Sequence, residues 1–159
     1  MADVIIDGYI RVSSVPSIAS LAAPTAAELN AGISWEMFLT PEGLTGFAST
    51  TNWVNNSALG STFDTQLPGT VSFGDMSVEF KWQAGTDTIY NTLIFGYSTN
   101  IVIRRRILRA TTFASTQPVE VYPVICGQFT PTEYERNSLA RFRVPVGLSI
   151  EPQLRAVVA

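Results

Sequence analysis

The amino-acid sequence predicts a mainly β domain, a sandwich or barrel with one short flanking α-helix at about residues 86–96. Apolar and polar residues alternate over several segments, as in strands that bury one face. Turn-forming residues separate these segments at short intervals, which is typical of sandwiches and barrels. Only two short segments have helical spacing. A chain of 159 residues is expected to form one domain, residues 1–159.

The first forty residues predict an arm, a short helix and a strand. Residues 1–23 are rich in Ser, Ala and Val, with Pro16 as a breaker, and are expected to form an extended N-terminal arm. Thr25 and Glu28 have the spacing of a capping box, which predicts a helix of one or two turns. The segment "ISWEMFLT", residues 33–40, alternates and predicts a strand.

Residues 41–69 predict a long irregular loop, because they are dense in Gly, Thr, Ser and Asn and keep no steady period. A long irregular stretch inside a compact domain is usually functional or disordered. Trp53 and Phe63 indicate that part of this loop packs against another surface. A mobile surface loop is the alternative.

The segment "TVSFGDMSVEFKWQ", residues 70–83, gives the clearest strand signal. Its alternation changes phase at Gly74, which predicts a bulge or a sharp bend. After Gly74 one face is apolar and the other is a continuous polar row of Asp75, Ser77, Glu79, Lys81 and Gln83. In the next segment, Thr86 or Asp87 can cap the short helix, whose apolar side is expected to cover the sheet.

The segment "NIVIRRRILRATT", residues 100–112, places arginines inside an apolar run of an otherwise acidic chain. Isoleucine and valine favour a strand, and its alternation puts Arg105 and Arg109 on one face and Arg104 and Arg106 on the other. A grip on nucleic acid, a membrane anchor and a contact between protein surfaces are three interpretations of this pattern. A core would not tolerate arginine on both faces without partners, since a buried unpaired charge is costly.

Two further strands are predicted towards the C-terminus. Residues 117–129 contain Pro118 and Pro123, which indicate an edge or irregular position. Residues 141–158 alternate strongly between apolar and polar side chains.

The composition favours a subunit of a larger assembly. Charged residues make up 14% of the chain, against about 25% in ordinary soluble domains, and the mean hydropathy is +0.20. A lone monomer would cover itself poorly with polar groups, so large contacts with copies of the same chain are expected. With a net charge of −3, the chain is a poor general binder of nucleic acid.

The cellular compartment can also be predicted. No apolar run approaches the roughly 18–20 residues that a spanning helix needs, so no membrane contact is expected. Asp3, Asp7 and Arg11 lie where a signal peptide would need an apolar core, so the chain is expected to be made in a cytoplasm. The single Cys126 suits a reducing compartment.

The residue types argue against catalysis. The chain has no histidine, which removes the commonest general base and metal ligand. With one cysteine it also lacks the ligands of a conventional zinc site. No phosphate loop or dinucleotide fingerprint is present. We therefore expect no enzyme, no cofactor and no metal.

Two stretches carry a resemblance to a known family. "APTAAELNAG" with the following "ISWEMFLTPEGL", and the late "QPVEVYPVICGQFTPTEYERNSLARFRVPV", resemble the major tail (tail tube) proteins of long-tailed bacteriophages, most of all those of phages infecting actinobacteria. The resemblance covers nearly the whole chain, through element order and composition and not through reactive residues. It implies a β-sandwich-like barrel whose copies form rings, six to a ring, that stack into a tube for the genome.

The resemblance also implies partners and positions. Expected partners are copies of the same chain, other tail proteins at the tube ends, a tape measure protein in the lumen, and double-stranded DNA that passes without specific binding. The virion tail is the expected location. The polar row Asp75, Ser77, Glu79, Lys81 and Gln83 is the candidate lumen lining, with a solvated sheet face as the alternative. Trp53 and Phe63 are candidates for contacts between rings.

Arginines and carboxylates are the candidate subunit contacts. Strong attraction to DNA would impede its passage, so a contact between copies is favoured over a DNA grip. The candidates are Arg104, Arg105, Arg106 and Arg109, with Glu120, Glu133 and Glu135 of a neighbouring copy as partners. Pairing within one subunit and a lumen position are the alternatives.

Two other functions fit the same sequence. A non-catalytic carbohydrate-binding module could use Trp35, Trp53 and Trp82, but Trp35 and Trp82 fall on apolar strand faces and are expected in the core. Another ring-forming virion protein, such as a tail terminator or a capsid decoration protein, is the third candidate.

Overall fold

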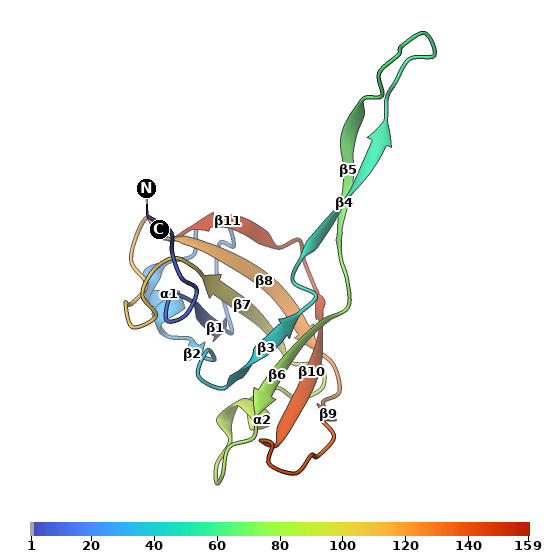
Figure 1. Ribbon diagram of the computed structural model, residues 1–159. Helices are drawn as coiled ribbons and strands as arrows, with labels where there is room; N and C mark the ends of the chain where they lie inside the picture. Colours follow the sequence, from blue (N-terminus) through green and yellow to red (C-terminus); the bar gives the residue numbers. More distant parts are fainter. Residues whose placement is uncertain (1) are drawn as a thin grey trace.

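The computed structural model describes residues 2–159 as a curved main sheet and a separate hairpin (Figure 1). Its elements in chain order are β1 (Arg11–Val15), α1 (Ala26–Asn30), β2 (Ile33–Ser34), β3 (Leu39–Thr45), β4 (Ser49–Asn55), β5 (Gln66–Phe73), β6 (Met76–Lys81), α2 (Thr88–Thr92), β7 (Ser98–Arg104), β8 (Pro118–Cys126), β9 (Thr130–Pro131), β10 (Arg141–Leu148) and β11 (Gln153–Val157). The predicted fold class, mainly β with a short flanking helix, is confirmed.

The main sheet is antiparallel and runs in the order β2-β1-β7-β8-β10-β6-β3, with β11 paired to β8 and β9 paired to β10. The other two strands, β4 and β5, pair only with each other. They project from one end of the main sheet, so the molecule has a body and a long arm (Figure 1).

The core has two parts, one on each side of the sheet. The inner cluster lies within the curve of the sheet and includes Phe80, Ile101, Ile103, Phe142 and Val144. The outer cluster lies on the other side of β7 and β8, beside α1, and includes Leu29, Val102, Phe113 and Val121. Strands β7 and β8 are therefore buried on both faces, which explains why the predicted arginine strand is apolar on both sides.

Both predicted helices form, and their caps are those predicted. The hydroxyl of Thr25 accepts from the amide of Glu28, whose carboxylate accepts from the amide of Thr25 at 2.9 Å. The carboxylate of Asp87 accepts from the amide of Tyr90 at 3.0 Å at the start of α2. Helix α2 is shorter than the predicted 86–96, and it places Ile89 against the inner cluster.

The predicted N-terminal arm is wrong in its middle. Arg11–Val15 form β1, an internal strand that pairs with both β2 and β7. Val12 and Val15 are buried, one in each part of the core. Burial of these two valines stabilises the segment as a paired strand, whereas composition alone suggested an extended arm without partners.

The predicted strand 33–40 is also interrupted. Residues 35–38 form a turn in which the amide of Phe38 donates to the carbonyl of Trp35 at 2.8 Å. The turn separates side chains that alternation had placed on one face: Trp35 is 2% exposed and packs in the core, whereas Met37 is 58% exposed.

Two further predictions are corrected in the later strands. The arginine strand ends at Arg104, because Arg106 has a left-handed backbone with φ 68°. Strand β8 is central and not an edge. Pro123 is tolerated because it lies between the stretch of β8 that pairs with β11 and the stretch that pairs with β10.

Candidate assembly surfaces

The stretch predicted as the long loop 41–69 is largely strand. It contains most of β3 and, beyond it, the arm formed by β4 and β5. The arm pairs Ser49 with Phe73 at its base and Asn55 with Gln66 near its tip, with a bulge between. The sequence carried a signal for it: Thr, Trp and Val flank a cluster of Asn, Ser and Gly, the pattern of a hairpin.

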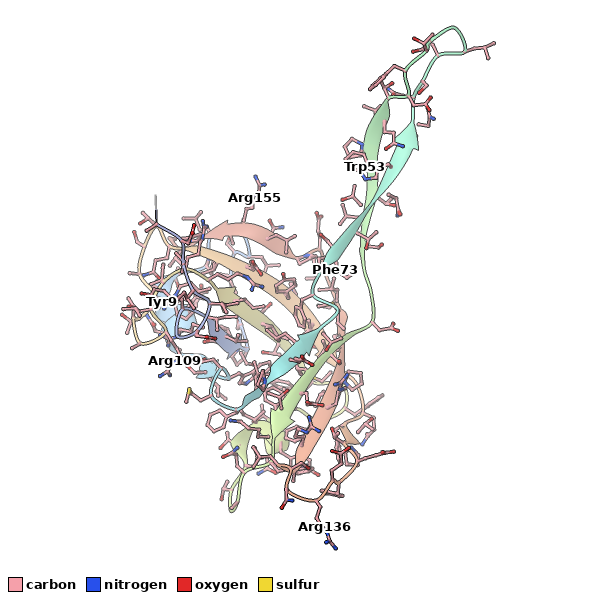
Figure 2. The ribbon with its side chains drawn as sticks, viewed as in Figure 1. Tyr9, Trp53, Phe73, Arg109, Arg136 and Arg155 are labelled. Carbon is pink, nitrogen blue, oxygen red and sulfur yellow. The ribbon has the colours of Figure 1, made fainter. Side chains whose placement is uncertain are left out.

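The arm exposes apolar side chains along its length. Trp53 is 60% exposed and lies midway along the arm, away from the body (Figure 2). Phe63, near the tip, is 75% exposed. Sequence reasoning missed four other exposed apolar residues of the arm: Val54, Leu59, Leu67 and Val71. A two-stranded hairpin is marginally stable in water, so this arm is suited to contact another surface.

Beyond Gly74, which lies between β5 and β6, the predicted polar row begins at the base of the arm. Asp75 and Gln83 are exposed, and Ser77 and Lys81 are partly buried. Glu79 is buried and lies within hydrogen-bond distance of Arg141 at 3.4 Å and Arg143 at 3.1 Å. The hydroxyl of Thr40 also donates to it at 3.0 Å.

The environment of Glu79 lowers the pKa of its carboxyl group. Burial acts to raise its pKa, but the hydrogen bonds from Arg143 and Thr40 and the charges of Arg143 and Arg141 outweigh burial. The pKa of Glu79 therefore lies below its ordinary value. One carboxylate is thus shared by two arginines of β10.

Arg104 is completely buried, and its guanidinium acts within the chain. It donates to the carbonyls of Leu108 at 2.9 Å, Thr111 at 2.7 Å and Thr112 at 3.2 Å. It also lies over the ring of Phe113, as does Arg11, its cross-strand neighbour. These contacts hold the arginine loop, residues 105–117, against the sheet.

Two of the other arginines pair within the same chain. Arg105 makes a bidentate contact with Glu120, at 3.0 and 3.3 Å, and this hydrogen bond raises the pKa of Arg105. Arg109 lies 3.7 Å from Glu36. Pairing within one subunit, the alternative named above, is thus observed for Arg105 and Glu120.

The remaining candidates lie apart from this cluster. Arg106 is exposed at the turn after β7, and no carboxylate of residues 2–159 lies within 4 Å of it. Glu133 and Glu135 are exposed in the loop between β9 and β10. In Figure 2, Arg136 marks this loop at the end of the body opposite the arm. The structure therefore does not bring Glu133 or Glu135 to the arginines of the same chain.

The tryptophans are placed as predicted from their strand faces. Trp35 packs edge-on against Phe80, with ring centroids 5.0 Å apart. Trp82 is partly buried against Tyr90 and Phe142, at 4.5 and 4.8 Å between centroids. Their expected place in the core is confirmed, which leaves Trp53 as the exposed indole.

In the described part of the chain, no three His, Cys, Asp or Glu side chains gather as a metal site would require. None of the helices between residues 2 and 159 has the length and apolar character needed to cross a bilayer.

Comparisons with known proteins agree with the architecture. A search of the curated proteins gave no match. Among solved structures, a chain from the cryo-EM structure of the anti-feeding prophage baseplate, six-fold symmetrised, shares the fold. The TM-score is 0.61 at 9% sequence identity, over 98% of each chain.

Similarity of fold does not show which family the chain belongs to, but a family model does. The model described as "phage tail tube protein" matches residues 1–159, which is the whole chain. The chain belongs to the phage tail tube protein family.

Proposed function

We propose that the chain is the repeating subunit of a phage tail tube, in which six copies form a ring and rings stack into a conduit for the genome. The observation that carries this proposal is the β4–β5 arm, which exposes Trp53, Leu59 and Phe63 and pairs with no other strand of residues 2–159. Family membership supports a structural role in the virion tail. The low content of charged residues supports large contacts between subunits.

The surfaces take different roles in this proposal. The arm, with Trp53 and Phe63, joins neighbouring rings. Exposed Arg106 meets Glu133 and Glu135 of an adjacent copy, and Arg109, which is partly buried beside Glu36 of its own chain, contributes to the same contact. The row from Asp75 to Gln83 lines the lumen, where a tape measure protein and then double-stranded DNA pass without specific binding. The subunit has no catalytic role and is made in the host cytoplasm, in the cell of an actinobacterium.

Electron microscopy of the purified protein tests this function directly. Negative-stain images, with sizing chromatography beside them, are expected to show hollow tubes or stacked rings of one diameter. Closed rings that never stack would favour a tail terminator or decoration protein. A protein that stays monomeric at high concentration, and also when mixed with preformed tail ends, would contradict self-assembly.

The exposed Trp53 favours one second candidate, a carbohydrate-binding module, because an exposed indole can stack on a sugar ring. A glycan array separates the two functions. Binding that is lost in Trp53→Ala while no rings form would favour the module.

A further inference from the structure

A groove lies at the base of the arm, on the side of β11. It has a volume of about 890 Å³ and is formed between β5 and the connection from β10 to β11. Its apolar lining includes Val71, Phe73, Leu148, Ile150 and Leu154, and several of these side chains are largely exposed. An exposed apolar surface next to a projecting arm indicates a contact site.

Arg155 is the one basic residue among the described residues that line this groove. Arg155 lines it and projects outward from β11 (Figure 2). No carboxylate of residues 2–159 lies within 4 Å of its guanidinium, although Glu151 lines the same groove. The groove thus combines an apolar floor with an unpaired positive charge.

The tip of the arm has the complementary composition. Leu59 and Phe63 are exposed apolar side chains, and Asp64 beside them is exposed and has no basic partner within the described chain. The tip is held in shape by its own hydrogen bonds: the hydroxyl of Ser61 donates to the carbonyl of Phe63 at 2.8 Å, and that of Thr65 to Asn56 at 2.6 Å. Such preorganisation lowers the entropy lost on docking.

We propose that the arm tip of one copy occupies the groove at the base of the arm of the next copy, with Leu59 and Phe63 on its apolar floor and Asp64 beside Arg155. This inference rests on the proposed function and names the contact that links successive subunits. The tip cannot reach its own groove: an extended strand rises about 3.3 Å per residue, so the ten residue steps from Phe63 to Phe73 place it about 30 Å away. Because stacked rings need a contact that repeats along the tube, the contact is heterologous and runs head to tail.

The other large grooves match the tip less well. The groove between the N-terminal segment and β3, of about 880 Å³, has an apolar floor but, within residues 2–159, no exposed, unpaired cation, because Lys81 is partly buried and Arg105 is paired with Glu120. The groove beside Glu79, of about 620 Å³, is lined mainly by polar and charged side chains, and Arg141 and Arg143 are already paired with Glu79. Among these three, only the groove at Arg155 offers both an apolar floor and a cation that is exposed and unpaired in the described part of the chain.

Disulfide cross-linking tests the contact. In Phe63→Cys/Ile150→Cys, mild oxidation is expected to give a ladder of covalent multimers on a non-reducing gel, because each copy carries both halves of the contact. Native Cys126 does not interfere, since it is buried and burial raises the pKa of its thiol to about 11. The controls are each single variant, which can give dimers at most, and Phe63→Cys/Arg136→Cys, whose second cysteine lies at the far end of the body.

Charge exchange supplies a second readout. Asp64→Arg and Arg155→Asp are each expected to raise the concentration needed for assembly about fivefold, and the double variant is expected to return it to within about twofold of the unmodified chain. Unchanged circular dichroism of each variant shows that the fold is kept. The inference is overturned if the double charge variant does not recover assembly, or if the double-cysteine variant forms tubes but gives no ladder. Either result leaves the proposed tube function unaffected. If the unmodified chain forms no rings and Phe63→Cys/Ile150→Cys forms no ladder, both fall.

Discussion

At the scale of single residues, Arg104 shows how a buried charge can be accommodated without a carboxylate. Its guanidinium is surrounded by main-chain carbonyls of the arginine loop, by the side-chain oxygen of Gln117 at 2.9 Å and by the ring of Phe113. Burial lowers its pKa, and the charge of Arg11 lowers it further. The hydrogen bonds that the guanidinium donates to these carbonyls and to Gln117 compensate for the cost of burying it.

The first prediction concerns this residue. Arg104→Met keeps most of the side-chain volume and removes every donor, so the free energy of unfolding is expected to fall by about 3 kcal/mol. Urea denaturation measures this loss. Arg106→Met, an exposed neighbour in the same loop, is the matched control and is expected to change stability by less than about 0.5 kcal/mol. Equal effects of the two variants would show that the Arg104 contacts stabilise nothing.

The second prediction follows from the lowered pKa of Glu79. Because its folded pKa lies below the unfolded value, Glu79 stabilises the fold above the unfolded pKa of about 4.3, and this contribution is lost as the pH falls through the folded pKa. Between pH 7 and pH 3, the unfolding free energy is expected to fall less in Glu79→Gln than in the unmodified chain. Urea titrations at several pH values measure the difference. Parallel pH curves for the two proteins would contradict it.

At the scale of elements, the arm is built as a separate unit. Its strands pair with each other and not with the main sheet, and Ser49 lies opposite Phe73 where the arm leaves the body. Phe73 packs on Tyr122, with ring centroids 6.1 Å apart, so the base of the arm belongs to the core while the rest does not.

The third prediction separates folding from assembly at this scale. Replacing residues 50–72 by an Asn-Gly turn joins Ser49 to Phe73 through the two-residue connection that a hairpin favours. The shortened chain is expected to keep its thermal midpoint within a few degrees and to lose ring and tube formation, as seen by calorimetry and electron microscopy. A shortened chain that still forms tubes would show that the arm is not needed for assembly.

The same scale shows what could be predicted from sequence. The capping box of Thr25 and Glu28 and the Asp87 cap were predictable because their hydrogen bonds are local. The phase change at Gly74 marked the passage from the arm to the body for the same reason. The pairing of β1 with β7 was not predictable, because the two strands lie far apart in the chain. Nor was the burial of Glu79, which depends on arginines from β10.

The candidate surfaces, too, were predictable where the signal is local and not where distant segments meet. Exposure of Trp53 and Phe63 agrees with the interpretation of residues 41–69 as a functional stretch, although the stretch is mainly strand. Alternation could not show that Arg104 is enclosed by the loop that follows it, because a loop has no period. The groove at Arg155 is formed by segments about 80 residues apart, so only the folded chain shows it.

At the scale of the whole molecule, the proposed contacts between copies would be the main source of further stability, because the chain is low in charge and its arm is apolar. A protein whose folded state binds copies of itself gains about 2.7 kcal/mol for a hundredfold rise in concentration, as long as sites remain open. For a domain of this size that gain corresponds to a rise of about 5–10 °C in the thermal midpoint.

The fourth prediction is therefore a melting curve that depends on protein concentration. The midpoint of the full chain is expected to rise by about 5–10 °C over a hundredfold range of concentration, because the contacts made by the arm form only between copies. The chain shortened at residues 50–72 is the control, and its midpoint is expected to stay constant. Differential scanning fluorimetry of both proteins in one buffer measures the two slopes. A constant midpoint for the full chain would mean that its exposed apolar surface is not covered by copies of itself, and the arm would then need a different partner.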